Sequence, residues 1–220
     1  MRVIQILPQL NIGGVERGTL DLSKALIEQG HESFVISGGG ILVDELIRSG
    51  AKHYEIPVHI KSLRTLYLAK SLSEKISSID PDIVHIRSRM PAWVNYRAFK
   101  MLKKKPLLIS TFHGLYSIPI YSKVMSFVDH SIAISKTVER YILENYRLDK
   151  DDITVIPRGC DPIEFNNDVI NPSDKANIIE EFPQIVGKKV LTIPGRITKW
   201  KGVAEFIELL SLLDDNYHGL

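Results

Sequence analysis

"LPQLNIGGVERGTLDLSKALIEQGH", residues 7–31, is the stretch that decides the fold of this chain. Two adjacent glycines, Gly13 and Gly14, separate an apolar run from a segment with the spacing of an amphipathic helix, at 16–29. The apolar residues that fall near one face of this helix are Leu20, Leu22, Ala25, Leu26 and Ile27. Gly30 follows where a C-terminal cap belongs. The stretch therefore predicts a strand, a glycine loop and a helix in succession.

The rest of the chain continues this alternation of short β-rich runs and helical patterns. The β-rich runs lie at residues 2–7, 33–37, 53–58, 82–87, 107–112, 130–135 and 153–157. Parallel neighbours in a sheet need crossover connections, and the connections here are helical. The sequence predicts an α/β fold, a doubly wound, Rossmann-like parallel sheet with helices on both faces.

The organisation of the chain changes after the seventh run. We expect residues 1–165 to form an N-terminal Rossmann-like domain. Residues 166–187 are polar and carry two prolines and a glycine around a short helical pattern, which predicts a linker. Residues 188–220 hold one further strand and one further helix. Because these cannot bury their own apolar faces, we expect them to begin a second Rossmann-like domain that is incomplete in this chain.

The composition of the chain limits which binding partners and which cellular compartment are expected. Lysine and arginine number 28 against 26 acidic residues, and the resulting net charge of +2 disfavours a nucleic-acid partner. The single cysteine, Cys160, excludes an internal disulfide and is expected to be a buried small residue, not a nucleophile. No apolar stretch approaches the roughly 20 residues that span a bilayer. We expect a cytoplasmic protein, or one attached peripherally to the inner face of the cytoplasmic membrane.

The paired glycines lie where doubly wound sheets bind ligands, beyond the carboxyl end of a strand. Without a Cβ, backbone N–H groups at Gly13 and Gly14 can approach an anion, and the following helix adds its positive dipole end. A phosphate site and a simple tight turn both fit this pattern. The spacing is not G-x-G-x-x-G, which disfavours a nicotinamide or flavin dinucleotide. A second glycine run, at 37–41, is expected to be a flexible turn.

Several motifs, in this order, resemble family 4 of the retaining glycosyltransferases. They are "GGVERGTLDLSKAL" (13–26), "DIVHIRSR" (82–89), "STFHG" (110–114), "HSIAISK" (130–136), "VIPRGCD" (155–161) and "PGRITKWKG" (194–202). The resemblance implies two Rossmann-like domains facing each other across a cleft. It also implies a nucleotide-sugar donor as substrate, with no metal and no cofactor. Some details are similar to a bacterial branch associated with lipopolysaccharide and other surface glycans.

The resemblance also implies which residues bind the donor. Arg196 and Lys201 stand at the positions of the arginine and lysine that, with the amides of Gly13 and Gly14, hold the donor diphosphate in this family. His113 stands where the family has a histidine that contacts the transferring sugar, so we expect it at the reaction centre, although not as a base.

Other charged residues are candidates for acceptor binding or for lining the cleft: Glu16, Arg17, Arg87, Arg89, Arg158 and Asp161. Arg87 and Arg89 leave a strand and could hold a phosphorylated or acidic acceptor, or could be surface charges. The chain departs from the family pattern at two positions. Gly18 stands where some relatives have a carboxylate or a histidine, and Arg158 where many have asparagine.

Three further features have a structural interpretation. Asp80 and Asp82 have the D-x-D spacing of metal-dependent transferases, but we expect them to cap a helix and turn the chain. His85 lies inside a strand and is expected in the core. The segment 91–106 mixes aromatic and basic residues; it could lie on an anionic membrane or be an ordinary packed helix with a solvated basic end.

The resemblance therefore implies a glycosyltransferase that moves a hexosyl-type sugar from a nucleotide-diphosphate sugar to a lipopolysaccharide or other surface-glycan acceptor, with retention of configuration. The glutamate-rich donor motif of the family would fall beyond Leu220. We therefore expect this chain alone to be weakly active or inactive. The alternative is a non-catalytic, acceptor-binding half that works with a separate donor domain.

Overall fold

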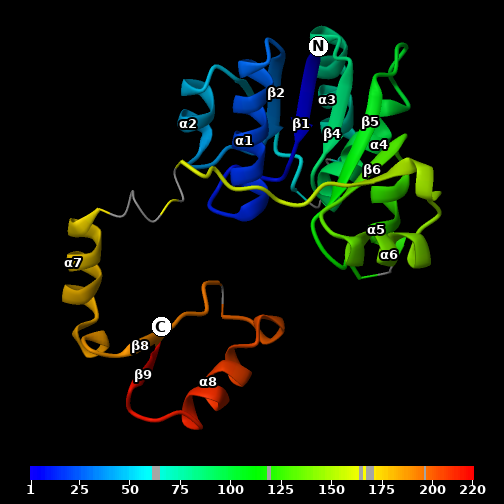
Figure 1. Cartoon of the computed structure of the whole chain (residues 1–220). Helices are drawn as coiled ribbons and strands as arrows, with labels where there is room; N and C mark the ends of the chain where they lie inside the picture. The colour runs from blue at the N-terminus through cyan, green and yellow to red at the C-terminus, as the bar shows by residue number, and fades with distance from the viewer. Residues whose placement is uncertain (61–64, 118–119, 164–165, 167–170, 196) are drawn as a thin grey trace. The chain divides into compact units, whose positions relative to one another are not determined.

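The structure, a computed structural model, describes residues 1–60, 65–117, 120–163, 166, 171–195 and 197–220. Within these ranges the chain forms two compact units, Met1–Arg158 and Gly159–Leu220, shown in Figure 1 and treated separately below. The domain boundaries expected from the sequence remain predictions.

The first unit is built on a seven-stranded, all-parallel sheet, within the part of the chain that the structure describes. Its strands are β1 (Arg2–Ile6), β2 (Glu32–Ser37), β3 (Lys52–Glu55), β4 (Ile83–Ile86), β5 (Leu107–Phe112), β6 (His130–Ala133) and β7 (Ile153–Val155). Its helices are α1 (Gly14–Glu28), α2 (Val43–Arg48), α3 (Thr65–Ile79), α4 (Arg89–Phe99), α5 (Ile120–Lys123) and α6 (Lys136–Asn145). All seven predicted strands are present, so the predicted α/β fold is confirmed.

The order of the strands fixes where loops gather. The sheet runs β3-β2-β1-β4-β5-β6-β7, so chain order reverses between β1 and β4. Ile6 of β1 is in register with Ile86 of β4, and the chain leaves both strands at the same edge of the sheet. Such a reversal opens a crevice at the carboxyl edge, because the two connections depart toward opposite faces.

Two apolar clusters lie on the two faces of the sheet. On β2, Phe34 and Ile36 belong to a large cluster that includes residues of α3 and α4. Val35, between them, belongs to a smaller cluster with Leu20 of α1 and Leu46 of α2. This alternation follows from the period of two in a strand. Figure 1 shows α1 and α2 together beside β1 and β2.

Helix α1 meets the sheet through a partly polar face, which differs from the prediction. Ala25 is exposed, whereas Thr19 and Ser23 are buried with Leu20. The reason is Gln5 of β1, which is fully buried and donates to the carbonyl of Thr19 (3.1 Å) and to Ser23 Oγ (2.9 Å). The predicted cap is present, since Gly30 has φ +76° and its N–H donates to the carbonyl of Ile27.

The glycine run at 37–41 is a turn that supports the loop after β1. The Gly38 N–H donates to the carbonyl of Pro8, and the Leu10 N–H donates to the carbonyl of Gly39, at 2.9 and 2.8 Å. Gly40 has φ +142°, and a Cβ there would collide with the backbone carbonyl of Leu10. The two loops therefore pack backbone to backbone, as only glycine allows.

The second unit contains α7 (Pro172–Glu181), β8 (Lys189–Leu191), α8 (Val203–Ser211) and β9 (Tyr217–Gly219). The strands β8 and β9 pair in parallel, so the described part of this unit has one strand more than the sequence predicts. β9 was missed because it is three residues long and has no apolar alternation. In the described ranges, no helix has the length and apolar character of a membrane span.

The prediction for Cys160 is wrong: the residue is exposed. It follows β7, an edge strand, in a segment whose residues from Ile156 to Ile163 are all exposed. A small residue in this exposed segment has no apolar core to enter.

The Gly40 contact predicts a large stability effect from a small substitution. Gly40→Ala adds a backbone collision to an unfavourable φ, whereas Gly30→Ala changes only φ, because nothing lies within 4 Å of its Cβ position. We expect Gly30→Ala to lower the free energy of unfolding by about 1 kcal/mol and Gly40→Ala by roughly 2 kcal/mol more. Urea unfolding followed by circular dichroism measures both; equal losses would show that the loop packing is loose.

Candidate functional site

Residues from four loops meet at the carboxyl edge of the sheet, around the point where strand order reverses. Gly14 and Gly18 open α1 after β1, Arg87 follows β4, His113 follows β5 and Arg158 follows β7. We call these five residues the switch-point site. Parallel topology explains the gathering, because all of these strands end at one edge.

Arg87 is the buried cation of the site, with 6% of its surface exposed. Its Nη1 donates to Gln5 Oε1 at 2.8 Å, and its backbone N–H donates to the carbonyl of Ile6. Burial, and then the positive charge of Arg158, lower the pKa of Arg87 to about 10, against the opposing influence of Glu16. Arg87 therefore stays charged at neutral pH, and its Nε is buried without a partner in the described ranges.

His113 is held by its neighbours on two sides. Its backbone N–H donates to Tyr116 Oη at 3.3 Å. Its ring Nδ1 lies 2.8 Å from Nη2 of Arg158, and Nη1 of Arg158 donates to the carbonyl of Gly14. Arg158 thus joins the start of α1 to the end of β5.

The contact with Arg158 defines the protonation of the imidazole. A guanidinium has donors and no acceptor, so Nδ1 of His113 must accept, and the neutral ring carries its proton on Nε2. Nε2 is buried and has no hydrogen-bond partner among the described residues. A buried N–H without an acceptor costs roughly 1–3 kcal/mol, which a ligand oxygen would regain.

The electrostatics keep His113 neutral. Burial, followed by the positive charges of Arg87 and Arg158, lowers the pKa of His113 to about 3. His113 is therefore a hydrogen-bond donor through Nε2 and not a base. Its expected place at the reaction centre remains a prediction.

The glycines of α1 leave space for charged side chains. A Cβ on Gly18 would lie 2.9 Å from Nη1 of Arg158 and 3.2 Å from Nη2 of Arg87. At Gly13 the carboxylate of Glu16 occupies the space that a Cβ would take. Glu16 therefore stands at the helix N-terminus, where the dipole favours negative charge.

Three other predicted residues have partners outside the switch-point site. Arg17 pairs with Glu45 of α2 at 2.5 Å. Arg89 donates hydrogen bonds to Ser117 and Ser122. Its guanidinium also lies over the rings of Tyr116 and Tyr121, so its contacts are with residues that follow β5. Asp161 accepts from the N–H of Ile163 at 2.8 Å and belongs to the second unit.

The predicted donor-binding cations belong to the second unit. Arg196 lies outside the described residues. Lys201 ends a short 3-10 helix, and its Cε lies 3.7 Å from where a Cβ of Gly195 would be. The side chain of Lys201 therefore lies next to Gly195. Joint binding by these cations and the glycine loop remains a prediction.

His85 and the D-x-D pair have structural partners. Nε2 of His85 lies 2.7 Å from Thr111 Oγ1, and burial lowers its pKa well below 6.5, so it is a neutral core residue as predicted. Asp80 pairs with Arg2 and Lys104, and Asp82 accepts from the N–H of Arg2. The two carboxylates tie β1 to the chain between α3 and β4.

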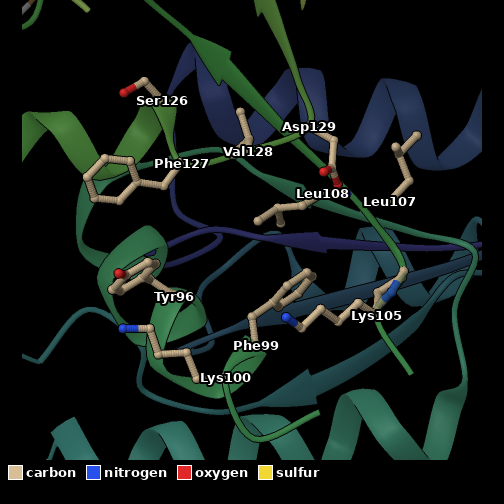
Figure 2. Close-up of a pocket in the computed structure, with 11 residues that line it drawn as sticks. Tyr96, Phe99, Lys100, Lys105, Leu107, Leu108, Ser126, Phe127, Val128 and Asp129 are labelled. Atoms are coloured by element: carbon tan, nitrogen blue, oxygen red, sulfur yellow. Dashed lines mark hydrogen bonds between the residues drawn. The ribbon is translucent and has the colours of Figure 1, made fainter. Parts of the chain in front are cut away.

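A groove of about 690 Å³ lies at the opposite edge of the sheet, where β5 and β6 begin. Figure 2 shows Tyr96 and Phe99 of α4 on one side of it and Phe127 and Val128 on the other. Phe99, Tyr96 and Trp93 pack against the core, so the segment 91–106 begins as an ordinary packed helix. Arg97 lies in the last turn of α4, and the lysines of the segment follow the end of the helix.

Two residues that hold the switch-point site in place, Gln5 and Tyr116, were not predicted. Gln5 is a polar residue in the middle of an apolar strand, and that pattern could have marked it as a buried partner of Arg87. Tyr116 lies in a loop without a regular pattern, and no sequence signal connects it to His113.

Comparison with known proteins identifies the family. The model of Glycosyltransferase Family 4 matches residues 12–164, more than half of the chain. The chain belongs to this family.

Similar proteins agree with the family 4 assignment. A solved glycosyltransferase from Rickettsia africae is 35% identical, with a TM-score of 0.79 over 97% of this chain and 57% of that one. One component of human phosphatidylinositol N-acetylglucosaminyltransferase is 25% identical over 185 residues, which are 77% of this chain and 38% of that protein. Anabaena HepE, solved with UDP and glucose, is 16% identical, with a TM-score of 0.80 over 100% of this chain and 60% of that one, and shows the fold alone. The family 4 chain spans less than two thirds of each of these proteins.

The electrostatics of this family 4 site predict a pH dependence. The unfolded chain has a His113 pKa near the ordinary 6.5, and the folded chain has one of about 3. Below about pH 6.5 the unfolded state therefore binds a proton that the native state does not, so stability falls as pH decreases toward 3. We expect the NMR signals of the His113 ring to show no titration between pH 5 and 8. A midpoint near 6.5 would contradict the buried, neutral state.

Proposed function

We propose that this chain provides the acceptor-side domain of a retaining glycosyltransferase that uses a nucleotide-diphosphate sugar. The observation that supports this most is the Nε2–H donor of a neutral His113, buried without a partner among the described residues, beside the glycine-opened start of α1. An uncharged donor next to a positively charged site suits a hydroxyl-bearing group that is attached to an anion. A nucleotide-diphosphate sugar has both parts.

In this proposal the diphosphate lies at the start of α1. The first N–H groups of a helix have no intrahelical acceptor, and the dipole favours an anion there. Arg87 adds a fixed positive charge, and Glu16 moves away from Gly13 when the anion binds. Arg196 and Lys201 of the second unit complete the site and balance the charge that develops on the departing phosphate.

The proposed reaction breaks the bond between the anomeric carbon and the phosphate oxygen. An acceptor hydroxyl oxygen bonds to the anomeric carbon on the same face, so configuration is retained, and its proton passes to the departing phosphate. The nucleoside diphosphate leaves with the bonding electron pair. His113 holds a hydroxyl of the transferring sugar through Nε2–H. We take a lipopolysaccharide or another surface glycan as the acceptor, with Arg87 available to an acidic group on it.

The proposal predicts the effect of removing the donor. His113→Ala in the natural protein should lower kcat/KM by roughly 10- to 100-fold, the equivalent of one hydrogen bond made in the transition state. His113→Gln, which keeps an N–H donor, should lose less. His130→Ala, at the amino end of β6, is the control and should retain activity. Transfer of labelled sugar from a panel of nucleotide-sugars to glycan acceptors measures all three.

The same assay distinguishes a glycosyltransferase from a non-catalytic, acceptor-binding half. If the protein is a glycosyltransferase, it transfers sugar without any added domain, and NMR of the product reports the anomeric configuration. An acceptor-binding module transfers sugar only when a separate donor domain is added. A product of inverted configuration, or equal activity in His113→Ala and the wild type, would contradict the proposed mechanism.

We further propose that the protein contacts an anionic membrane through the surface at the groove in Figure 2. This surface combines the groove residues Lys100, Lys105, Leu107 and Phe127 with Met101 and Lys103, which follow α4 and line a neighbouring hollow. The three lysines are exposed, and the three apolar side chains keep 50%, 47% and 47% of their surface exposed. Each lysine near an anionic surface contributes about 1 kcal/mol to membrane binding. Exposed apolar side chains add burial in the headgroup region.

Flotation with phosphatidylglycerol-containing vesicles tests the membrane contact. We expect the protein to float with anionic vesicles at low salt and not with phosphatidylcholine alone. Replacing Lys100, Lys103 and Lys105 by glutamate should abolish flotation, whereas the same change at the exposed Lys24, Lys136 and Lys150 should leave much more of it. Absence of wild-type flotation at low salt would end the membrane proposal without affecting the transferase proposal.

A further inference from the structure

We propose that Arg158 is a positioning residue that holds His113 as an Nε2–H donor, and that Gly18 provides the space for it. The inference rests on the proposed role of His113 in the reaction. Its first test, however, measures the imidazole itself and requires no activity.

The contacts of Arg158 are specific although its side chain is exposed. Its two terminal nitrogens donate in a fork, one to the carbonyl of Gly14 and one to Nδ1 of His113 at 2.8 Å. These acceptors are 144 and 45 residues away in sequence. A guanidinium fork has a fixed geometry, so a bond to the rigid helix start also fixes the position of the second bond.

Charge argues against a purely structural role. Arg158 lies close enough to Arg87 that its positive charge contributes to lowering the pKa of Arg87. Bringing a second cation to a buried one opposes folding. Arg87 itself does not hold the ring, because the bond that its Nη1 makes is to Gln5. Of the two bonds that Arg158 makes, the bond to His113 fixes the orientation and protonation of the ring, and the bond to the Gly14 carbonyl anchors the guanidinium for it.

Gly18 is the complement of Arg158. A side chain at this position would meet Nη1 of Arg158 at 2.9 Å, closer than a real Cβ contact. The atom that would yield is the far end of a flexible side chain and not backbone, so a Cβ there would displace the guanidinium and leave the helix intact. Gly18 and Arg158 are the two positions at which the sequence departs from the family pattern. The guanidinium of Arg158 lies where a side chain at position 18 would be.

Several other titratable residues lie around the imidazole of His113, and the variants used in a test must keep these residues. Arg87 approaches from the end of β4, His85 from within β4 and Tyr116 from the loop after β5. Glu16 approaches Arg87 from α1. Substitutions at positions 14 and 158 add no atom beside these residues. A Cβ at position 18 would also lie 3.2 Å from Nη2 of Arg87, so Arg158→Met, which leaves Arg87 uncrowded, is the primary test and Gly18→Ala supports it.

Nitrogen NMR of the histidine-labelled chain tests the inference. In the wild type we expect Nδ1 of His113 to be unprotonated and hydrogen-bonded, and Nε2 to carry the proton. In Arg158→Met the nitrogen chemical shift of Nδ1 should change to that of an unprotonated ring nitrogen that accepts no hydrogen bond. The pKa of the ring should rise because a like charge is lost. Gly18→Ala should cause the same change in Nδ1 with Arg158 still present. Gly14→Ala is the matched control: its Cβ would lie 3.7 Å from Nη1 of Arg158, an ordinary contact, so Nδ1 should stay as in the wild type.

Activity of the natural protein gives the second readout. Arg158→Met should lower kcat about tenfold with little change in KM, because the donor is misplaced while binding persists. Arg158→Lys keeps one donor and should recover part of the loss, and urea unfolding midpoints should match the wild type. An unchanged Nδ1 resonance in Arg158→Met would overturn the inference. If the natural protein transfers no sugar, the proposed function fails, and the nitrogen resonances still decide the inference.

Discussion

A buried guanidinium at the end of β4 sets the chemistry of the switch-point site. Arg87 is fixed by Gln5, which is itself fixed by α1, so its charge can neither turn away nor gain solvent. Any neighbour must then be neutral, anionic or exposed. His113 is neutral, Glu16 is anionic and Arg158 is exposed. A fixed positive charge beside a neutral donor is suited to an anionic ligand that also carries hydroxyl groups.

The sheet topology explains why these residues meet. The reversal between β1 and β4 places the start of α1 next to the end of β4, and β5 follows on the far side of β4. Two backbone-packed loops, at 8–11 and 38–42, hold the approach to the glycines in place. The site is therefore largely built before a ligand arrives, which reduces the entropy lost on binding. Arg158 completes it from β7.

Much of the fold could be predicted from the sequence, because buried parallel strands and amphipathic helices have strong periodic patterns. The positions of His113 and Arg87 at the carboxyl edge follow from those patterns, since each comes directly after a strand. The pairing of His113 with Arg158 could not be predicted, because it joins residues 45 positions apart through side-chain length and space left by Gly18. The exposure of Cys160 and the strand β9 were missed for a related reason: short segments carry too little pattern to show what covers them.

A crystal structure of the natural protein with an intact nucleotide-diphosphate sugar tests the central claim most directly. We expect the diphosphate at the amides of Gly13 and Gly14, and His113 Nε2 at about 3 Å from a hydroxyl oxygen of the sugar. A sugar bound elsewhere, with Nε2 of His113 still lacking an acceptor, would contradict the role assigned to this imidazole.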